Sequence, residues 1–237
     1  MSNPLYKRIL LKLSGEALQG EGDFGFDPKV FTRLTDEIVQ LTKSGVQVAI
    51  VLGGGNLFRG SKFSMTGIDR VTVDHMGMLG TIMNVIAMRD MLNNAGIPTR
   101  AMSAISLEGI IEKSDRLKAI HQLEKGRVVL FAGGTGNPLV TTDSTASLRA
   151  IEIKADVLLK ATNVDGVYDK DPIKHKDAKL YTHLSFKEAL DKELAVMDLT
   201  SFYQCRDNQL PIRVFNINLP NILQQVITDA NIGTTVK

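Results

Sequence analysis

Short, uniformly apolar runs alternate along the chain with longer stretches whose apolar residues recur every three or four positions. The short runs predict strands buried on both faces, as in a parallel sheet, and the longer stretches predict amphipathic helices. Strands that alternate with helices form β-α-β units with right-handed crossovers, so we expect an α/β fold around a mostly parallel sheet. The strand candidates are residues 6–13, 46–52, 99–102, 128–132, 156–162 and 212–215.

Capping residues mark the ends of the helices. Asp27 and Pro28 open a helix that Gly45 ends, and Asp74 is expected to cap a long helix that reaches Asn94. We expect residues 61–73, before this helix, to be irregular. The other helix candidates are residues 114–125, 143–153, 185–192, 198–207 and 221–228, and a polar tail follows them.

The first turns of the long helix are apolar on most faces, and residues 76–88 carry no charge. This run is shorter than the roughly 18 residues of a membrane-spanning helix, and charged residues flank it. A helix of this kind is buried, either in a contact between subunits or in the core of one chain. The pattern alone does not choose between the two.

The composition is that of an ordinary globular protein, with 43% apolar and 23% charged residues. A net charge of +2 indicates no nucleic acid partner. The single cysteine, Cys205, cannot form an internal disulfide, which favours a reducing compartment, and we interpret it as structural rather than nucleophilic. Lys12 interrupts the first apolar run too early for a signal peptide. We therefore expect a cytoplasmic protein with no membrane contact. The length allows one or two domains and nothing in the composition requires two, so we expect one domain over residues 1–237.

Two lysines, Lys12 and Lys160, stand near the carboxyl ends of apolar strands. A buried ammonium group is costly unless it reaches water or an anion, so each lysine is placed to reach past its strand toward a ligand. For Lys12 the alternative is a side chain that extends into solvent from an edge strand.

Residues 48–60 join an apolar strand to three glycines, Gly53–Gly55, with Arg59 four residues further on. Glycine lets the backbone approach a ligand closely, and exposed N–H groups beside a cation form a cradle for phosphate. A tight turn that needs small residues is the alternative.

A second strand, residues 128–132, also leads into glycines, and hydroxyls and an acid follow at the start of a helix. Backbone N–H groups and the positive end of the helix dipole make this segment a second candidate for anion binding. Helix capping by Thr142 or Asp143 explains the same residues and is compatible with that role.

Gly20, Gly22 and Gly25 match the dinucleotide-binding pattern literally. That pattern should open a helix directly after a strand, whereas here residues 16–19 intervene and the helix starts later. We interpret these glycines as a flexible surface loop. After Lys160, a polar loop over residues 162–172 contains one aromatic residue, Tyr168, which either stacks on a base or packs under the loop.

Ligands of parallel α/β sheets bind at the carboxyl ends of the strands, where these four loops should meet. Two glycine loops, two lysines and an arginine suit a site that holds two phosphorylated groups face to face. No P-loop pattern is present, and none of the four histidines lies in these loops. A phosphate acceptor needs no general base, because a phosphate monoester is largely a dianion at pH 7.

Five motifs resemble those of the bacterial uridylate kinases, which belong to the amino acid kinase superfamily: KLSGEAL at 12–18, GGGNLFRG at 53–60, DHMGML at 74–79, GTGNPLVTTD at 134–143 and KATNVDGVYDKDP at 160–172. The resemblance covers essentially the whole chain. It implies a three-layer α/β/α fold and Mg²⁺-dependent transfer of phosphate from ATP to UMP in pyrimidine nucleotide biosynthesis. It also implies a homohexamer that GTP activates and UTP inhibits.

The resemblance further implies roles for individual residues. It places ATP mainly on the C-terminal part and UMP mainly on the N-terminal part of the chain. The implied catalytic residues are Lys12, Arg59, Lys160 and Asp143, with Asp198 as a weaker candidate; no metal-ligating side chain is implied. The implied ATP-binding residues are Lys12, Leu13, Ser14, Gly15, Gly55, Arg59, Thr162, Asn163, Tyr168 and Asp171. Those for UMP are Gly54, Asp74, Thr135, Gly136, Asn137, Pro138, Leu139, Val140, Thr141 and Thr142. The implied GTP region is Gly20, Glu21, Gly22, Asp23, Phe24 and Gly25.

Two other functions fit the residues. One is a different kinase of the superfamily that acts on a carboxylate, a carbamate or another small phosphate. The other is a nucleotide-binding regulator or storage protein on the same scaffold, which would keep the glycine loops but need not keep both lysines.

Overall fold

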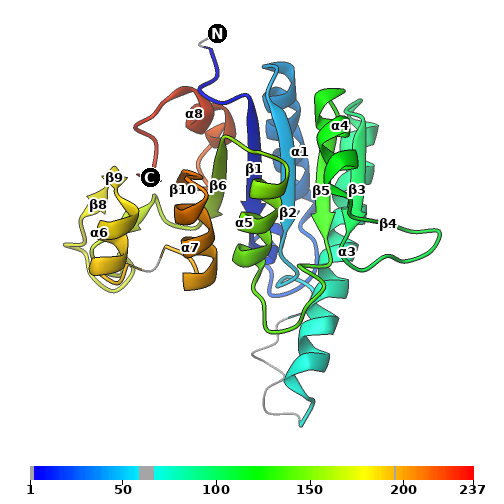
Figure 1. The fold of residues 1–237 in the computed structure, drawn as a ribbon, viewed down its shortest axis with the longest axis horizontal. Helices are drawn as coiled ribbons and strands as arrows, with labels where there is room; N and C mark the ends of the chain where they lie inside the picture. The colour runs from blue at the N-terminus through cyan, green and yellow to red at the C-terminus, as the bar shows by residue number, and fades with distance from the viewer. Residues whose placement is uncertain (1–2, 59–66, 195) are drawn as a thin grey trace.

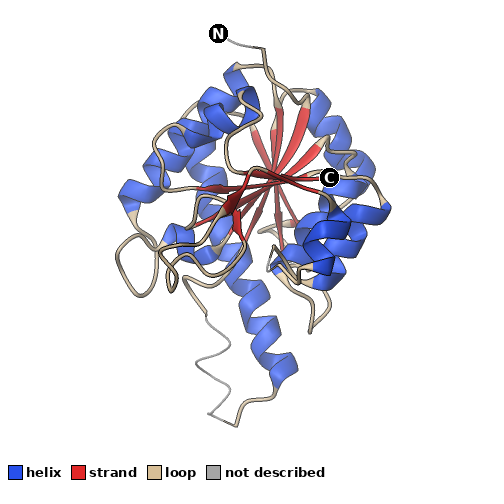
Figure 2. Cartoon of the chain, turned by 90° about the vertical axis from the view of Figure 1, so that its left-hand side faces the viewer, coloured by secondary structure: helices blue, strands red, loops and turns tan. Residues whose placement is uncertain are grey.

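The fold is a central sheet between two layers of helices, seen in a computed structural model that describes residues 3–58, 67–194 and 196–237. Figure 2 shows the strands nearly edge-on, with helices on both sides. The described strands are β1 (Arg8–Leu13), β2 (Gln47–Leu52), β3 (Thr99–Ser103), β4 (Glu112–Lys113), β5 (Val128–Ala132), β6 (Val157–Thr162), β7 (Val167–Tyr168), β8 (Leu180–Tyr181), β9 (His183–Leu184), β10 (Ile212–Asn216) and β11 (Thr234–Val236).

The described helices include one 3₁₀ helix and seven α-helices, labelled as in Figure 1. They are η1 (Gly15–Leu18), α1 (Pro28–Lys43), α3 (Arg70–Asn94), α4 (Arg116–Glu124), α5 (Thr142–Glu152), α6 (Phe186–Asp191), α7 (Leu199–Asp207) and α8 (Ile222–Thr228).

The main sheet of the described chain has nine strands in the order β4-β3-β5-β2-β1-β6-β10-β11-β9. Its strands pair in parallel except β10 with β11, and β7 and β8 form a separate antiparallel pair. The predicted mostly parallel α/β/α sandwich is therefore confirmed. Strand β1 lies between β2 and β6, so Lys12 is not on an edge strand.

Each central strand buries side chains on both faces, which explains the uniformly apolar runs. In β1, Ile9, Leu11 and Leu13 pack into the core layer with α1, α3 and α8, whereas Leu10 packs into the opposite layer with α4, α5 and α7. Because side chains alternate along a strand, Lys12 lies on the same face as Leu10, toward α5.

The long helix begins earlier than predicted. Asp69, not Asp74, caps α3, because the Asp69 carboxylate accepts a hydrogen bond from the N–H of Val71 at 2.9 Å. The prediction of irregular structure up to residue 73 is therefore wrong for residues 70–73. Asp74 lies one turn inside the helix, where its side chain is available for other contacts.

One face of α3 belongs to the core and the other is open in the single chain. Val85, Met88 and Leu92 are fully buried, whereas Met76, Leu79 and Met83 are exposed, Met83 by 53%. We call Met76, Leu79 and Met83 the α3 stripe. Helix α3 is long and apolar enough to cross a membrane by length and composition, a test that a core helix also passes, and its buried side packs on the sheet.

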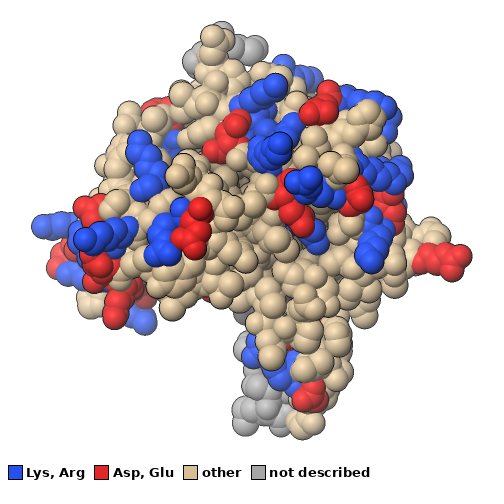
Figure 3. Space-filling model, in the orientation of Figure 1, with Lys and Arg blue, Asp and Glu red and all other residues tan. Residues whose placement is uncertain are grey.

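The tail is not entirely irregular. Thr234–Val236 forms β11 and pairs with β10, a contact that the polar sequence does not signal. Cys205 is buried, and burial raises the pKa of its thiol to about 12, which agrees with a structural role. Figure 3 shows basic and acidic side chains interspersed over the face in view.

Candidate active site

The loops that follow β1, β2, β5 and β6 meet at one edge of the sheet. In the strand register, Leu13 pairs with Leu52 and Lys12 pairs with Lys160, while β5 continues the sheet beyond β2. The predicted convergence of the four loops is therefore confirmed. Residues far apart in the sequence become neighbours because parallel strands end together.

The first two loops touch through their backbones. A Cβ atom on Gly15 would lie 2.2 Å from the Gly55 nitrogen, and one on Gly53 would lie 2.7 Å from the Gly15 nitrogen. No side chain fits between these backbones, which is the physical reason for glycine at both positions. Ser14 caps η1 by accepting a hydrogen bond from Ala17 N–H at 3.3 Å.

A single carboxylate lies between the two strand-end lysines. The Lys160 ammonium donates a hydrogen bond to Asp143 Oδ2 at 2.7 Å and another to the Val196 carbonyl at 2.5 Å. Lys12 Nζ lies 2.9 Å from Asp143 Oδ1 in an ion pair that lacks good hydrogen-bond alignment. The three side chains are largely but not fully buried, with 12–15% of each exposed. Lys12 is thus the less constrained of the two cations.

Burial and charge act against each other on these groups. Burial alone would raise the pKa of Asp143, but the charges of Lys12 and Lys160 outweigh it and hold the pKa below its ordinary value. Burial lowers the pKa of Lys160, and Asp143 only partly compensates. The carboxylate therefore stays ionised at neutral pH and keeps two cations together at the strand ends.

Helix α5 delivers Asp143 to this point. Its cap is Thr141, whose Oγ1 accepts a hydrogen bond from Ser144 N–H at 3.1 Å, so the alternative explanation of capping by Thr142 or Asp143 is wrong. Asp143 is consequently free to face the lysines. Asp198 does not bond the lysines; it accepts hydrogen bonds from the hydroxyls of Thr141, Ser144 and Ser201, and so ties the start of α5 to the start of α7.

A cavity of about 340 Å³ opens beside the glycine loops. Six residues from the predicted UMP set line it, and so does Gly55 from the ATP set. The six are Gly54, Asp74, Leu139, Val140, Thr141 and Thr142; Thr135, Gly136, Asn137 and Pro138 do not line it. Its size is at the lower end of the range for small-molecule sites.

Asp74 holds one wall of this cavity in place. Its Oδ2 accepts a hydrogen bond from Leu139 N–H at 2.8 Å, and its Oδ1 accepts one from Arg70 Nε at 3.0 Å. Leu139 has a φ of 65°, which is strained for a leucine. The contact with Asp74 therefore stabilises an unfavourable backbone conformation at the mouth of the cavity.

Several residues that line this cavity were not predicted from the sequence. They are Phe58, Arg70, Val73, Gly77, Met78, Thr81, Gly134 and Thr145. Most belong to α3 and face inward only because of the packing of that helix. Spacing of three, four and seven residues from Asp74 would have indicated Gly77, Met78 and Thr81 as residues on the same helix face.

The predicted adenosine residues lie elsewhere. Thr162 Oγ1 donates to the Val164 carbonyl at 2.7 Å, and Asn163 accepts from Asn218 at 3.4 Å. Tyr168 is partly buried in β7, where burial and Asp165 raise its pKa. Asp171 is exposed and accepts from Ile173 N–H at 2.9 Å. None of these four lines the cavity beside Asp74, so that cavity does not bring them together with the predicted UMP residues.

The loop 20–25 lies on the surface, as predicted, with Phe24 73% exposed. Helix α1 begins only at Pro28, after the glycines, so the loop does not open a helix as a dinucleotide-binding motif would. The loop is attached to the glycine loop, because Gly25 N–H donates to the Asn56 carbonyl at 2.8 Å.

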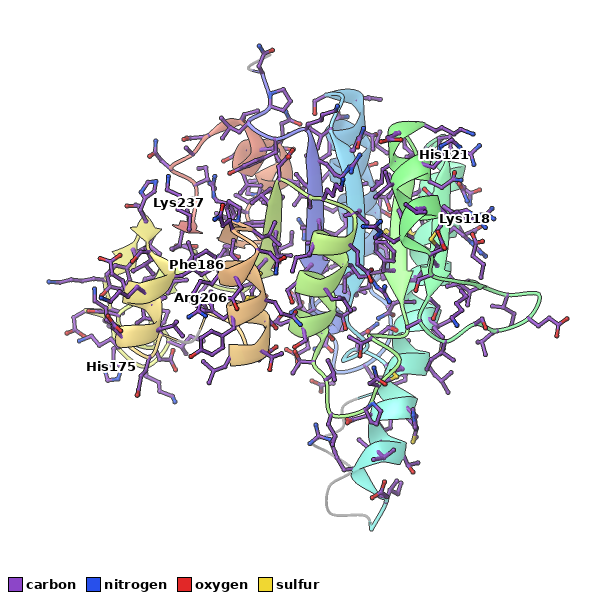
Figure 4. The ribbon with its side chains drawn as sticks, in the orientation of Figure 1. Lys118, His121, His175, Phe186, Arg206 and Lys237 are labelled. Atoms are coloured by element: carbon purple, nitrogen blue, oxygen red, sulfur yellow. The ribbon has the colours of Figure 1, made fainter. Side chains whose placement is uncertain are left out.

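Arg59 lies outside the described residues. In Figure 4, His121 and His175 lie on opposite sides of the molecule.

The described part of the chain contains no group of three or more His, Cys, Asp or Glu side chains that could hold a metal ion. Asp143, the acid nearest the lysines, is already paired with both of them.

The family follows from comparison with known proteins. The model of the amino acid kinase family matches residues 7–216. The chain belongs to this family. Among the family's members, a protein named uridylate kinase from Coxiella burnetii is 58% identical over 233 residues, which cover 98% of this chain and 96% of the relative. A uridylate kinase from Haemophilus influenzae is 58% identical over 236 residues, 100% of each chain.

Solved structures of the same family have the same fold. A UMP kinase from Bacillus anthracis has a TM-score of 0.95 and 38% identity, and covers 98% of this chain and 96% of its own. A UMP kinase from Ureaplasma parvum has a TM-score of 0.92 and 36% identity, with 98% of each chain covered. The chain is therefore a kinase of this family, and its resemblance to the uridylate kinases is confirmed.

The carboxylate between the lysines gives a prediction for the pH dependence of stability. The pKa of Asp143 is lower in the folded than in the unfolded chain, so its stabilising contribution is present above its ordinary value of 3.8 and is lost as the pH falls below it. Asp143→Asn should therefore destabilise the protein at pH 7 by about 3 kcal/mol, because two buried cations lose their partner. It should also flatten the loss of stability as the pH falls from about 4 to about 2.

Urea unfolding followed by circular dichroism across this pH range measures both effects. The matched control is Asp36→Asn, an exposed position on α1. Coincident curves of unfolding free energy against pH for the parent and Asp143→Asn would show that the ion pairs contribute nothing to folding.

Proposed function

We propose that this chain is a uridylate kinase that transfers the γ-phosphate of ATP to UMP and releases ADP and UDP. The observation that carries the proposal is the placement of Lys12 and Lys160, fixed by Asp143, where two glycine loops meet beside the cavity lined by Asp74. Relatives at 58% identity that carry this name support the choice of UMP over other acceptors. We place the reaction in pyrimidine nucleotide biosynthesis in the cytoplasm.

The transfer proceeds in line and needs no general base. The phosphate of UMP has a second pKa of about 6, so the attacking oxygen is already deprotonated at pH 7. Phosphoryl transfer then depends on positioning and on stabilising charge as it moves between the phosphates. Lys12, whose ion pair with Asp143 is poorly aligned, turns toward the transferring phosphate, while Lys160 stays hydrogen-bonded and stabilises the leaving side.

The nucleotides occupy two parts of a single domain over residues 1–237. UMP lies in the N-terminal part, in the cavity of Gly54, Asp74 and Thr141–Thr142, with Asp74 toward its sugar. ATP lies mainly in the C-terminal part, with its phosphates at Lys12, Ser14 and Gly15 and its adenosine near Thr162 and Tyr168. Arg59 binds the nucleotide phosphates where the donor, ATP, and the acceptor, UMP, meet.

Mg²⁺ enters this proposal with the substrate. The described side chains contain no group that could hold a metal ion by itself, and Mg²⁺ would be bound through phosphate oxygens and water. When bound, it neutralises phosphate charge. The protein's own contribution is the pair of lysines and the backbone N–H groups of the glycine loops.

The experiment that tests the function is a coupled ADP-release assay with MgATP and a panel of UMP, CMP, AMP, acetylglutamate and carbamate. We expect turnover with UMP, and a loss of about 10²-fold or more in kcat for Lys12→Ala, as for the removal of a preorganised donor. Turnover with acetylglutamate or carbamate alone would indicate another kinase of the family. Nucleotide binding without any turnover would indicate a regulator.

A substitution of Asp74 tests the proposal that UMP and ATP bind in different parts of the site. Asp74→Asn keeps an oxygen that can accept from Leu139 N–H but removes the charge that faces the sugar of UMP. We expect the KM for UMP to rise about tenfold and the KM for ATP to change little, since one charge-assisted hydrogen bond is weakened. Steady-state kinetics with each substrate varied provides the measurement, and Asp90→Asn, exposed on the same helix, is the control. A larger change in the KM for ATP would contradict this division.

We also propose that the chain assembles as a homohexamer, activated by GTP through the region 20–25 and inhibited by UTP. The support is the α3 stripe, whose three apolar side chains are exposed in the single chain. Exposed apolar residues in one row on a helix are typical of a contact surface. Figure 3 shows that much of the projecting end of α3 carries no charge.

Met83 is the most exposed residue of the α3 stripe, at 53%. Met83→Glu should reduce the sedimenting mass toward that of one chain, because an unpaired charge cannot be buried in an apolar contact. Analytical ultracentrifugation gives the mass, with Leu117→Glu on α4 as an exposed control. A parent protein that sediments as a single chain would refute the hexamer.

A further inference from the structure

Two asparagines form a buried pair behind the glycine loop. Asn56 is 1% exposed and Asn84, on α3, is 0% exposed. Asn84 Nδ2 donates to Asn56 Oδ1 at 2.7 Å, and Asn56 Nδ2 donates to Asn84 Oδ1 at 3.0 Å. Burial of an amide is costly unless its polar atoms are hydrogen-bonded, so a pair in this position holds a defined geometry.

The remaining bonds of the pair reach two loops. Asn84 Nδ2 also donates to the Gly53 carbonyl at 2.6 Å, and Asn56 Nδ2 donates to the Gly25 carbonyl at 3.0 Å. The backbone of Asn56 accepts from Gly25 N–H at 2.8 Å. The pair therefore links three segments that are distant in the sequence: the loop 20–25, the glycine loop 53–57 and helix α3.

The glycine loop has little room to move without losing its contacts. A Cβ atom on Gly54 would lie 2.6 Å from the Gly77 carbonyl of α3, and one on Gly15 would lie 2.8 Å from Asn56 Oδ1. The loop is thus packed between α3 on one side and the loop after β1 on the other. Hydrogen bonds from Asn84 determine where it lies between them.

We infer that Asn84, acting through Asn56, is a positioning residue that sets the glycine loop against Gly15 and attaches the loop 20–25 to it. Neither asparagine lines the cavity beside Asp74, so neither is placed to touch a nucleotide there. The role in catalysis rests on the proposed function, because Gly54 and Gly55 are the residues between the two phosphates. The structural link between the loops does not depend on the proposed function.

The test is Asn84→Asp, which keeps the size of the side chain but replaces the donor Nδ2 with an oxygen that faces the Gly53 carbonyl. We expect kcat with UMP to fall about 10- to 100-fold, because a displacement of about 1 Å of positioning groups has effects of this size. The KM values for ATP and UMP should change less than about threefold. The matched control is Asn94→Asp, the same change at an exposed position of the same helix, which should leave kcat unaltered.

Amide hydrogen exchange gives a readout that does not depend on turnover. In Asn84→Asp, protection should fall in both the loop 20–25 and residues 53–58, while α1 and β5 keep the exchange rates of the parent. If the parent does not phosphorylate UMP, the proposed function fails, and the exchange data alone still test the link between the loops. Asn84→Ala, which introduces no charge, gives the same test if Asn84→Asp does not fold. A folded variant with parental exchange in both loops and kcat within twofold of the parent would overturn the inference.

Discussion

The site depends on one electrostatic constraint: a single carboxylate, Asp143, lies between two ammonium groups on neighbouring strands and pairs with both of them. Lys12 and Lys160 are partners in the register of β1 and β6, so their side chains start side by side on the same face of the sheet. Without Asp143, two largely buried positive charges would face each other with no counter-charge between them. The carboxylate comes from a third segment, the start of α5, which Asp198 ties to α7. The arrangement of charge thus requires the whole α5 side of the sheet.

Helix α3 holds the loops of the uncharged part of the site in place. Three of its polar side chains each hold one loop: Asp74 accepts from Leu139 N–H, Thr81 Oγ1 accepts from Gly133 N–H at 2.7 Å, and Asn84 donates to the Gly53 carbonyl. These positions are 7 and 3 residues apart in the sequence and lie on one helix face. The opposite face carries the α3 stripe. A rigid helix therefore connects an exposed apolar surface directly to the backbone of both glycine loops.

Local signals predicted most of the fold and part of the site. Apolar runs located the central strands, and capping residues such as Asp27 located the start of α1, because these signals act within a few residues. The same reasoning failed for α3, where both Asp69 and Asp74 precede apolar turns and only the backbone shows which one caps the helix. It also failed for β11, because a short polar strand is formed by pairing with β10 rather than by its own composition.

The sequence by itself determined a parallel sheet, glycine loops and lysines at the strand ends, and the resemblance to uridylate kinases, because each depends on residue type and local order. Tertiary structure alone decided that Asp143 lies between Lys12 and Lys160, since strand register and the orientation of α5 bring them together. It also decided the partners of Asn56 and Asn84. A buried amide is determined by what surrounds it, and packing between distant segments supplies those surroundings.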